Sequence, residues 1–90
     1  MSPFVHQAED NRYEAVADEQ VVGTLDYSLA GKTMIIRHTE TVQDHRGQGI
    51  ARRLTRFALD DARRRGFVVR PECPYAQKFV EQHPEYSDVL

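Results

Sequence analysis

The first half of the chain alternates hydrophobic and polar positions with the period of β-strands. Residues 20–29 carry two interleaved sets: Val21, Gly23, Leu25, Tyr27 and Leu29 on one side, and Val22, Thr24, Asp26 and Ser28 on the other. This alternation predicts a half-buried strand. Shorter strands are predicted over residues 11–17 and 33–42, with an edge strand over residues 3–7. The short connections between them indicate an antiparallel meander.

The second half changes to the period of a helix. Over residues 48–65, apolar side chains recur at helical spacing at Ile50, Leu54, Phe57, Ala58 and Ala62. Gly66 follows as the expected stop, and residues 67–70 form one further predicted strand. Residues 74–82 predict a second helix that opens on a proline and closes before Pro84. The predicted fold is α+β: an antiparallel meander followed by helix, strand and helix.

The length of 90 residues predicts one domain over residues 1–90, because such a chain can build one core. Its 40% hydrophobic and 29% charged residues are typical of a globular protein. No apolar run approaches the ~18 residues of a membrane span, and the first residues lack the pattern of a secretory signal. The single cysteine suits a reducing compartment. We therefore expect a cytoplasmic location and no membrane contact.

The net charge of −2 is distributed unevenly along the chain. Residues 43–70 carry eight arginines against three aspartates, whereas residues 1–42 and 71–90 are both acidic. A basic segment between acidic flanks favours a compact anion, because both flanks would repel an extended nucleic acid. The charge pattern therefore predicts a small phosphorylated ligand and no nucleic-acid partner.

The first predicted helix is preceded by a glycine-rich loop, Arg46-Gly47-Gln48-Gly49-Ile50-Ala51, which offers no N-capping side chain. The first amide N–H groups of that helix are therefore expected to be unpaired and, with the helix dipole, to favour an anion. No Lys-Ser/Thr pair follows Gly49, which excludes a P-loop. A dinucleotide fingerprint would need a small residue where Arg52 stands. The loop predicts a phosphate site of another kind.

Two side chains outside the loop are candidates for chemistry. Cys73 stands directly before the second predicted helix, at its N-cap, where the positive helix end favours a reactive thiolate. The alternative for a lone cysteine is a buried, apolar role. His38 shares its predicted strand face with Met34, Ile36 and Glu40, so it is either a core histidine or a base supported by a carboxylate. No histidine pair has metal-ligand spacing with Cys73 or a carboxylate, so no metal site is predicted.

The loop sequence Arg46-x-x-Gly49-x-Ala51 resembles the pyrophosphate-binding signature of the GNAT superfamily of acyl-CoA-dependent N-acetyltransferases. Three further motifs look like the smallest single-domain branch of that superfamily: His-Thr-Glu-Thr-Val at 38–42, Arg-Pro-x-Cys-Pro-Tyr at 70–75 and His-Pro-Glu-Tyr at 83–86. The four motifs occur in the expected order, and the resemblance covers residues 11–86.

The resemblance implies an enzyme that moves an acetyl group from acetyl-CoA, its co-substrate, to an amine. The CoA moiety would be bound by Thr41, Val42, Arg46, Gly47, Gln48, Gly49, Ile50, Ala51 and Arg52. Cys73 and His38 would line the site beside the thioester, with Glu40 next to His38. Either Cys73 or Tyr75 would protonate the departing thiolate. A backbone N–H within residues 40–42 would polarise the thioester carbonyl. The acceptor stays open between a small amine, a peptide amine and a protein lysine.

Several alternatives stay open at this point. Acetyl transfer is either direct, which is the usual route of the superfamily, or passes through an acetyl group on Cys73. Tyr86 is an alternative to Tyr75 as proton donor, and Arg53 or Arg56 is a candidate partner for the 3′-phosphate of CoA. A chain that keeps the loop without the catalytic groups would instead be a non-catalytic CoA sensor.

Overall fold

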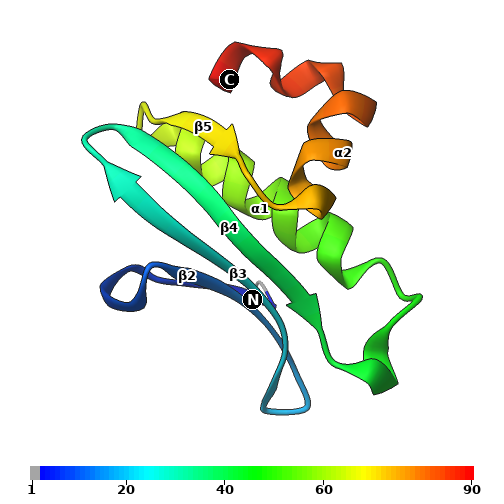
Figure 1. Ribbon diagram of the computed structural model, residues 1–90. Coiled ribbons are helices and arrows are strands. Elements are labelled where there is room, and N and C mark those ends of the chain that lie inside the picture. Colours follow the sequence, from blue (N-terminus) through cyan, green and yellow to red (C-terminus); the bar gives the residue numbers. More distant parts are fainter. Residues whose placement is uncertain (1–2) are drawn as a thin grey trace.

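A five-stranded sheet forms the frame of the molecule in the computed structural model, which describes residues 3–90. Its strands are β1 (Phe4–Gln7), β2 (Arg12–Ala17), β3 (Gln20–Ala30), β4 (Thr33–Thr41) and β5 (Val68–Pro71), in that order across the sheet. The chain forms α1 (Ile50–Arg64) between β4 and β5, and α2 (Pro74–Gln82) after β5 (Figure 1). Strands β1 to β4 are antiparallel, and β5 is parallel to β4. The α+β fold predicted from the sequence, with its edge strand, is confirmed.

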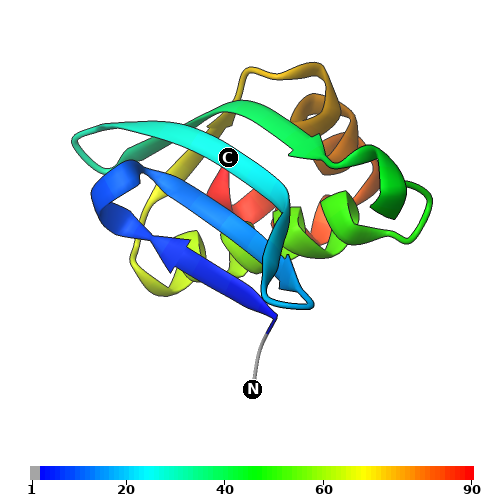
Figure 2. The ribbon, with the colours of Figure 1, turned by 90° about the horizontal axis from the view of Figure 1, so that it is seen from below.

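Both helices cover the same face of the sheet, and the hydrophobic core fills the layer between them (Figures 1 and 2). Leu25 of β3 and Leu54 of α1 are typical members, each with at most 1% of its surface exposed. Burying such a side chain contributes about 1.5–3 kcal/mol. A final 3₁₀ segment, η3 (Pro84–Val89), was not predicted, and it adds Tyr86 to the same core. Within residues 3–90, neither helix combines the length and apolar character needed to cross a bilayer.

Local signals set the helix ends closely. The second helix was predicted over residues 74–82, and α2 has these bounds, with Pro74 in its first turn. The first was predicted over residues 48–65, whereas α1 begins two residues later. The reason is Gly49, whose φ of +75° places it in the left-handed region as the N-cap and so keeps it outside the helix.

A register shift between β2 and β3 overturns part of the predicted alternation. Ala15 pairs with Gly23, but Val16 pairs with Val21, so Val22 is an extra residue in β3. Val22 is consequently 3% exposed and Val21 44% exposed, the reverse of the predicted assignment. A bulge of this kind moves every residue beyond it to the opposite face.

A second shift, in β4, changes the position of His38. Asp26 pairs with His38 and Tyr27 with Ile36, which leaves Arg37 as the extra residue. The side chain of His38 is 60% exposed, whereas Ile36 is fully buried. The prediction that these two side chains share a face was therefore wrong, because the bulge interrupts the period-2 pattern between them.

Strand β5 is too short to accompany β4 along its whole length. Their pairing ends at Ile36 and Pro71, where the amides of Glu72 and Cys73 both donate to the carbonyl of Ile36, at 3.0 and 3.2 Å. Beyond that point β4 continues beside the start of α2 instead of a strand. The C-terminal half of β4 is thereby left with one free edge, and this edge borders the candidate site.

Candidate functional site

The loop before α1 presents a row of unpaired backbone amides. Gly47 has a φ of +82° and Gly49 of +75°, and the helix start has no side-chain cap. Among residues 3–90, no acceptor receives a hydrogen bond from the amides of residues 47–52, and Arg53 is the first to bond, to the Gly49 carbonyl at 3.0 Å. The predicted uncapped helix start is confirmed. Such a row of N–H groups, at the positive end of a helix, favours an anion.

Two adjoining cavities, which we call the central groove, extend from this loop along β4. The cavity over the loop measures about 240 Å³ and is lined by Thr41, His45, Arg46, Gly47, Gly49, Ile50, Ala51, Arg52 and Tyr75. The second, about 490 Å³, is lined by His38, Thr39, Glu40, Thr41, Arg46, Ala51 and Tyr75. Four residues are common to both, so the groove is continuous from the loop to the free edge of β4.

Cations without a carboxylate partner are concentrated around this groove. Seven of the twelve Lys and Arg side chains form ion pairs with Asp or Glu. Within residues 3–90, those without such a partner are Lys32, Arg46, Arg52, Arg53 and Lys78. Arg46 and Arg52 line the groove, and Arg53 donates to the Gly49 and Gln48 carbonyls, both at 3.4 Å. Unneutralised charge is therefore available at the loop for a phosphorylated ligand.

Tyr75, in the first turn of α2, lines both cavities of the central groove. Burial raises the pKa of its hydroxyl above the ordinary value of 10.0, although nearby Arg52 acts in the opposite direction. The hydroxyl is therefore protonated at neutral pH and can donate a proton to a group in the groove. The predicted role of Tyr75 as proton donor to the leaving thiolate stays a prediction.

His38 and Glu40 form a pair at the edge of the groove. The Nε2 atom of His38 lies 3.2 Å from Oε2 of Glu40, and both side chains are about 60% exposed. Their predicted proximity is confirmed, although they lie on the outer side of β4 and not on its core side. Both residues line the larger cavity, so a group bound there can reach them.

Residues 12–89 match the profile of a family described as GCN5-related N-acetyl-transferase. This chain belongs to that family. Protein NATD1 of Bos taurus is 37% identical over 59 residues, which are 64% of this chain and 52% of the relative. Protein NATD1 of Danio rerio is 36% identical over 65 residues, which are 69% of this chain and 59% of the relative. The chain thus spans between 52% and 59% of these two relatives.

Solved structures of low identity share the fold. A GCN5-like protein of Staphylococcus aureus gives a TM-score of 0.75 at 21% identity, with 99% of this chain and 89% of that chain covered. A ribosomal-protein-alanine N-acetyltransferase of Brucella melitensis biovar Abortus 2308 gives 0.70 at 24%, with 86% and 63% covered. The likeness establishes a fold of the GCN5-related acetyltransferase type. The smaller branch implied by the Cys73-Pro74-Tyr75 motif stays a prediction.

Cys73 occupies a different position from the other candidates for acetyltransferase chemistry. Its Sγ accepts the amide N–H of Ala76 at 3.4 Å, which confirms the predicted N-cap of α2. The residue is 6% exposed and belongs to the core cluster, and it lines neither cavity of the central groove. The structure therefore gathers His38, Glu40 and Tyr75 around the groove and leaves the thiol in the core.

The backbone of β4 supplies one candidate oxyanion donor for this family's reaction. The amide of Val42 donates to the Val22 carbonyl at 2.9 Å, so it is already paired. Because successive residues of a strand direct their amides to opposite sides, the Thr41 amide faces the free edge. The Thr41 carbonyl, on that same side, accepts from Nε of Arg46 at 3.2 Å. Within the predicted range of residues 40–42, Thr41 is therefore the candidate backbone donor.

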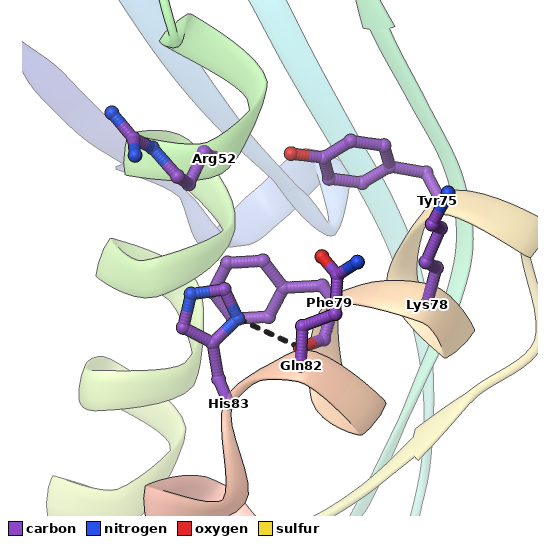
Figure 3. A pocket seen from close by; sticks show the side chains of 6 residues that line it. All are labelled: Arg52, Tyr75, Lys78, Phe79, Gln82 and His83. Carbon is purple, nitrogen blue, oxygen red and sulfur yellow. Dashed lines mark hydrogen bonds between the residues drawn. The ribbon is translucent and has the colours of Figure 1, made fainter.

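Two features of the site were not predicted from the sequence: Thr39, and a third cavity of about 340 Å³, the α1–α2 cavity. This cavity is lined by Arg52, Tyr75, Lys78, Phe79, Gln82 and His83 (Figure 3). Thr39 lines the larger cavity, but its orientation depends on the bulge at Arg37, which no local motif marks. Within residues 3–90, no three His, Cys, Asp or Glu side chains gather closely enough to hold a metal ion. That no metal takes part stays a prediction.

Proposed function

We propose that this chain is an acetyl-CoA-dependent N-acetyltransferase that transfers acetyl to an amine. The observation that carries the proposal is the row of unpaired amides at residues 47–52, flanked by Arg46 and Arg52, at one end of a groove leading past Tyr75. The pyrophosphate of CoA is a compact anion that can accept hydrogen bonds from unpaired backbone N–H groups and from guanidinium ions. The groove beyond offers space for the uncharged pantetheine arm.

Each part of the groove has a role in binding the co-substrate. The amides of residues 47–52 and the guanidinium of Arg46 hold the pyrophosphate, and Arg52 adds charge from the first turn of α1. The free edge of β4 at Thr41 and the small side chain of Ala51 border the arm. Acetyl-CoA supplies an activated acetyl thioester, which an amine nitrogen attacks with loss of the C–S bond.

Two proton transfers accompany the reaction, and groups from β4 and from α2 carry them out. The His38–Glu40 pair, with Nε2 and Oε2 3.2 Å apart, accepts the proton that the amine loses. The Tyr75 hydroxyl gives a proton to the departing thiolate. The Thr41 amide stabilises the negative charge that develops on the carbonyl oxygen. Direct transfer is favoured over an acetyl-Cys73 route, because the thiol is buried and lines neither cavity.

The acceptor class is an amine of small or polypeptide origin, including protein lysine. The exposed position of His38 and Glu40 suits either, because the larger cavity reaches the outer surface of β4. We further propose that the protein acts in the cytoplasm and needs neither nucleic acid nor a membrane.

The test is a turnover screen with acetyl-CoA and three groups of acceptors: polyamines, free amino acids and lysine-containing peptides. Release of free CoA thiol is followed, and binding of CoA is measured in parallel by calorimetry. Turnover with an acceptor supports the proposal. Tight CoA binding without turnover of any acceptor indicates the alternative, a CoA sensor. Failure of the chain to bind CoA overturns both functions.

A further inference from the structure

Beyond Ile36, the free edge of β4 has no neighbouring strand to bond its backbone. The pairing with β5 ends where the amides of Glu72 and Cys73 donate to the Ile36 carbonyl, at 3.0 and 3.2 Å. Strand β4 nevertheless continues to Thr41, which directs both its amide and its carbonyl to this edge. A backbone group at an unpaired edge has no partner strand to fix its direction. The orientation of Thr41 therefore depends on other contacts.

The side chain of Arg46 makes the bond that a neighbouring strand would otherwise make. Its Nε atom donates to the Thr41 carbonyl at 3.2 Å. The amide of the same peptide, that of Val42, donates in the opposite direction to the Val22 carbonyl of β3 at 2.9 Å. Because a trans peptide is planar and its C=O and N–H point to opposite sides, the two bonds hold it from both sides. The backbone at Thr41 is thereby fixed where β4 ends.

This contact leaves most of the Arg46 guanidinium available. Among residues 3–90, neither terminal nitrogen of Arg46 has a hydrogen-bond partner, and no carboxylate neutralises its charge. Arg46 also lines both cavities of the central groove. A guanidinium carries donors that point in different, fixed directions, so it can bind two acceptors at the same time. The charged end can therefore meet an anion while Nε stays on the Thr41 carbonyl.

We propose that Arg46 is a positioning residue that couples binding at the loop to the transfer step. Its terminal nitrogens contact the pyrophosphate, and its Nε atom holds the Thr41 backbone so that the Thr41 amide faces the thioester carbonyl. The inference rests on the proposed function, in which that amide stabilises the developing oxyanion. It adds that this guanidinium acts on kcat as well as on binding. A cation that only attracted the co-substrate would act on KM alone.

Two substitutions of Arg46 separate its two contacts. Glutamine has an amide nitrogen the same number of bonds from Cα as Nε of arginine, so Arg46→Gln keeps the donor to Thr41 and removes the charge. Lysine has a methylene group at that point and its ammonium one bond further on, so Arg46→Lys keeps the charge and removes the donor. Steady-state kinetics with acetyl-CoA and an amine that the wild type acetylates gives kcat and KM for each variant.

The two variants are expected to change different constants. Arg46→Lys should lower kcat about tenfold, less than the roughly 10²- to 10³-fold lost when an oxyanion donor is removed outright. Its KM for acetyl-CoA should change by less than about threefold. Arg46→Gln should raise KM by about threefold or more, with kcat within about twofold of the wild type.

Hydrogen exchange of the Val42 amide gives a readout that is independent of activity. The bond from this amide to Val22 should open more often once the other side of the peptide is released. We therefore expect faster exchange of Val42 in Arg46→Lys than in the wild type or in Arg46→Gln. The matched control is Arg63→Lys: Nε of Arg63 donates to Asp88 at 2.9 Å, and the residue lines neither cavity of the groove. This control should leave kcat, KM and Val42 exchange unchanged.

The set of variants separates the positioning role from the function beneath it. If the wild type neither binds nor turns over acetyl-CoA, the proposed function fails and the inference falls with it. If the wild type is active and Arg46→Lys keeps its kcat, the function stands and the inference is overturned. Equal losses of kcat in Arg46→Lys and Arg46→Gln also overturn it, because the retained donor would then have no effect. So does unchanged Val42 exchange in a slowed Arg46→Lys, since the backbone would not have been released.

Discussion

At the scale of single residues, Tyr75 holds a central place in the candidate site. Within residues 3–90, it alone lines the two cavities of the central groove and the α1–α2 cavity. Burial raises the pKa of its hydroxyl, which keeps the proton in place at neutral pH. The same residue therefore stands where the three cavities meet, and under the proposed function it offers the proton that a leaving thiolate needs.

Replacing Tyr75 with phenylalanine is expected to lower kcat by about 10²-fold, the contribution of a general acid. The affinity for CoA should change little, because the ring stays in place. In the wild type, kcat should fall at alkaline pH as the hydroxyl with its raised pKa ionises; the variant should lack this alkaline limb. Steady-state kinetics across pH, with calorimetry of CoA binding, measures both. An unchanged kcat would exclude Tyr75 as the acid.

Cys73, a candidate for chemistry in the sequence, has a structural role in the folded protein: its buried side chain caps α2. Cys73→Ala should cost about 1–2 kcal/mol of unfolding free energy, since it removes the cap on the Ala76 amide and leaves a small void. Cys73→Ser keeps a capping oxygen and should recover much of that loss together with turnover. Urea denaturation and steady-state rates check both variants.

The outcome that would contradict this structural role for Cys73 is chemical. Under the alternative route, the wild type mixed with acetyl-CoA would show an adduct of about 42 Da at the thiol in denaturing mass spectrometry. The serine variant would then be folded and inactive. Neither is expected, because the side chain is 6% exposed and outside the groove.

At the scale of elements, sequence patterns predicted the features that depend on neighbouring residues, namely the helix bounds and the strands. The bounds of α2 follow from a proline in its first turn, and the strands from alternation. The two bulges have no such signal: whether Val22 or Val21 is buried depends on the partner strand, and so does the face on which His38 lies. The uncapped start of α1 was predictable because the amides and glycines of the loop and Arg46 are neighbours in sequence.

The loop joining β4 to α1 allows a matched pair of glycine substitutions. Gly47 and Gly31 both have positive φ, +82° and +62°, and a Cβ on either would meet no atom within 4 Å. Each change to alanine should therefore cost a similar free energy of unfolding, about 1–2 kcal/mol. Only Gly47→Ala should weaken CoA binding, because its methyl group enters the cavity over the amides. Equal CoA affinities of the two variants, by calorimetry, would contradict the proposed pyrophosphate site.

At the scale of the whole molecule, a buried polar network joins the N-terminal strand to the end of α1. Asp61 accepts hydrogen bonds from Tyr13 and Arg65, both at 2.7 Å. His6 of β1 stacks on Tyr13 at 4.1 Å and contacts the hydroxyl of Tyr27 through Nε2. These groups are far apart in sequence, so spacing gave no indication of them. The α1–α2 cavity was unpredictable for the same reason, since its walls come from two helices.

The network gives the fold a pH dependence whose sign follows from His6. Burial lowers the pKa of His6 below 6.5, although Asp61 acts in the opposite direction. Its Nδ1 atom is buried, lies 3.4 Å from Asp61 and has no hydrogen-bond partner within the described chain. Below pH 6.5 the unfolded chain therefore takes up a proton that the folded chain resists. The stabilisation that depends on neutral His6 is fully present above pH 6.5. It is lost as the pH falls from 6.5 toward the lower pKa that His6 has in the folded chain.

We expect the wild-type chain to lose unfolding free energy between about pH 7 and about pH 5, as measured by urea denaturation. In His6→Gln, which carries no charge at either pH, this loss should become smaller. The control is His38→Gln, because His38 is 60% exposed and its removal should leave the slope intact. Asp61 does not produce the same effect: burial alone would raise the pKa of its carboxyl, but hydrogen bonds from Tyr13 and Arg65 lower it below 3.8. Its contribution is therefore lost only in stronger acid, and an undiminished slope in His6→Gln would show that another group controls this window.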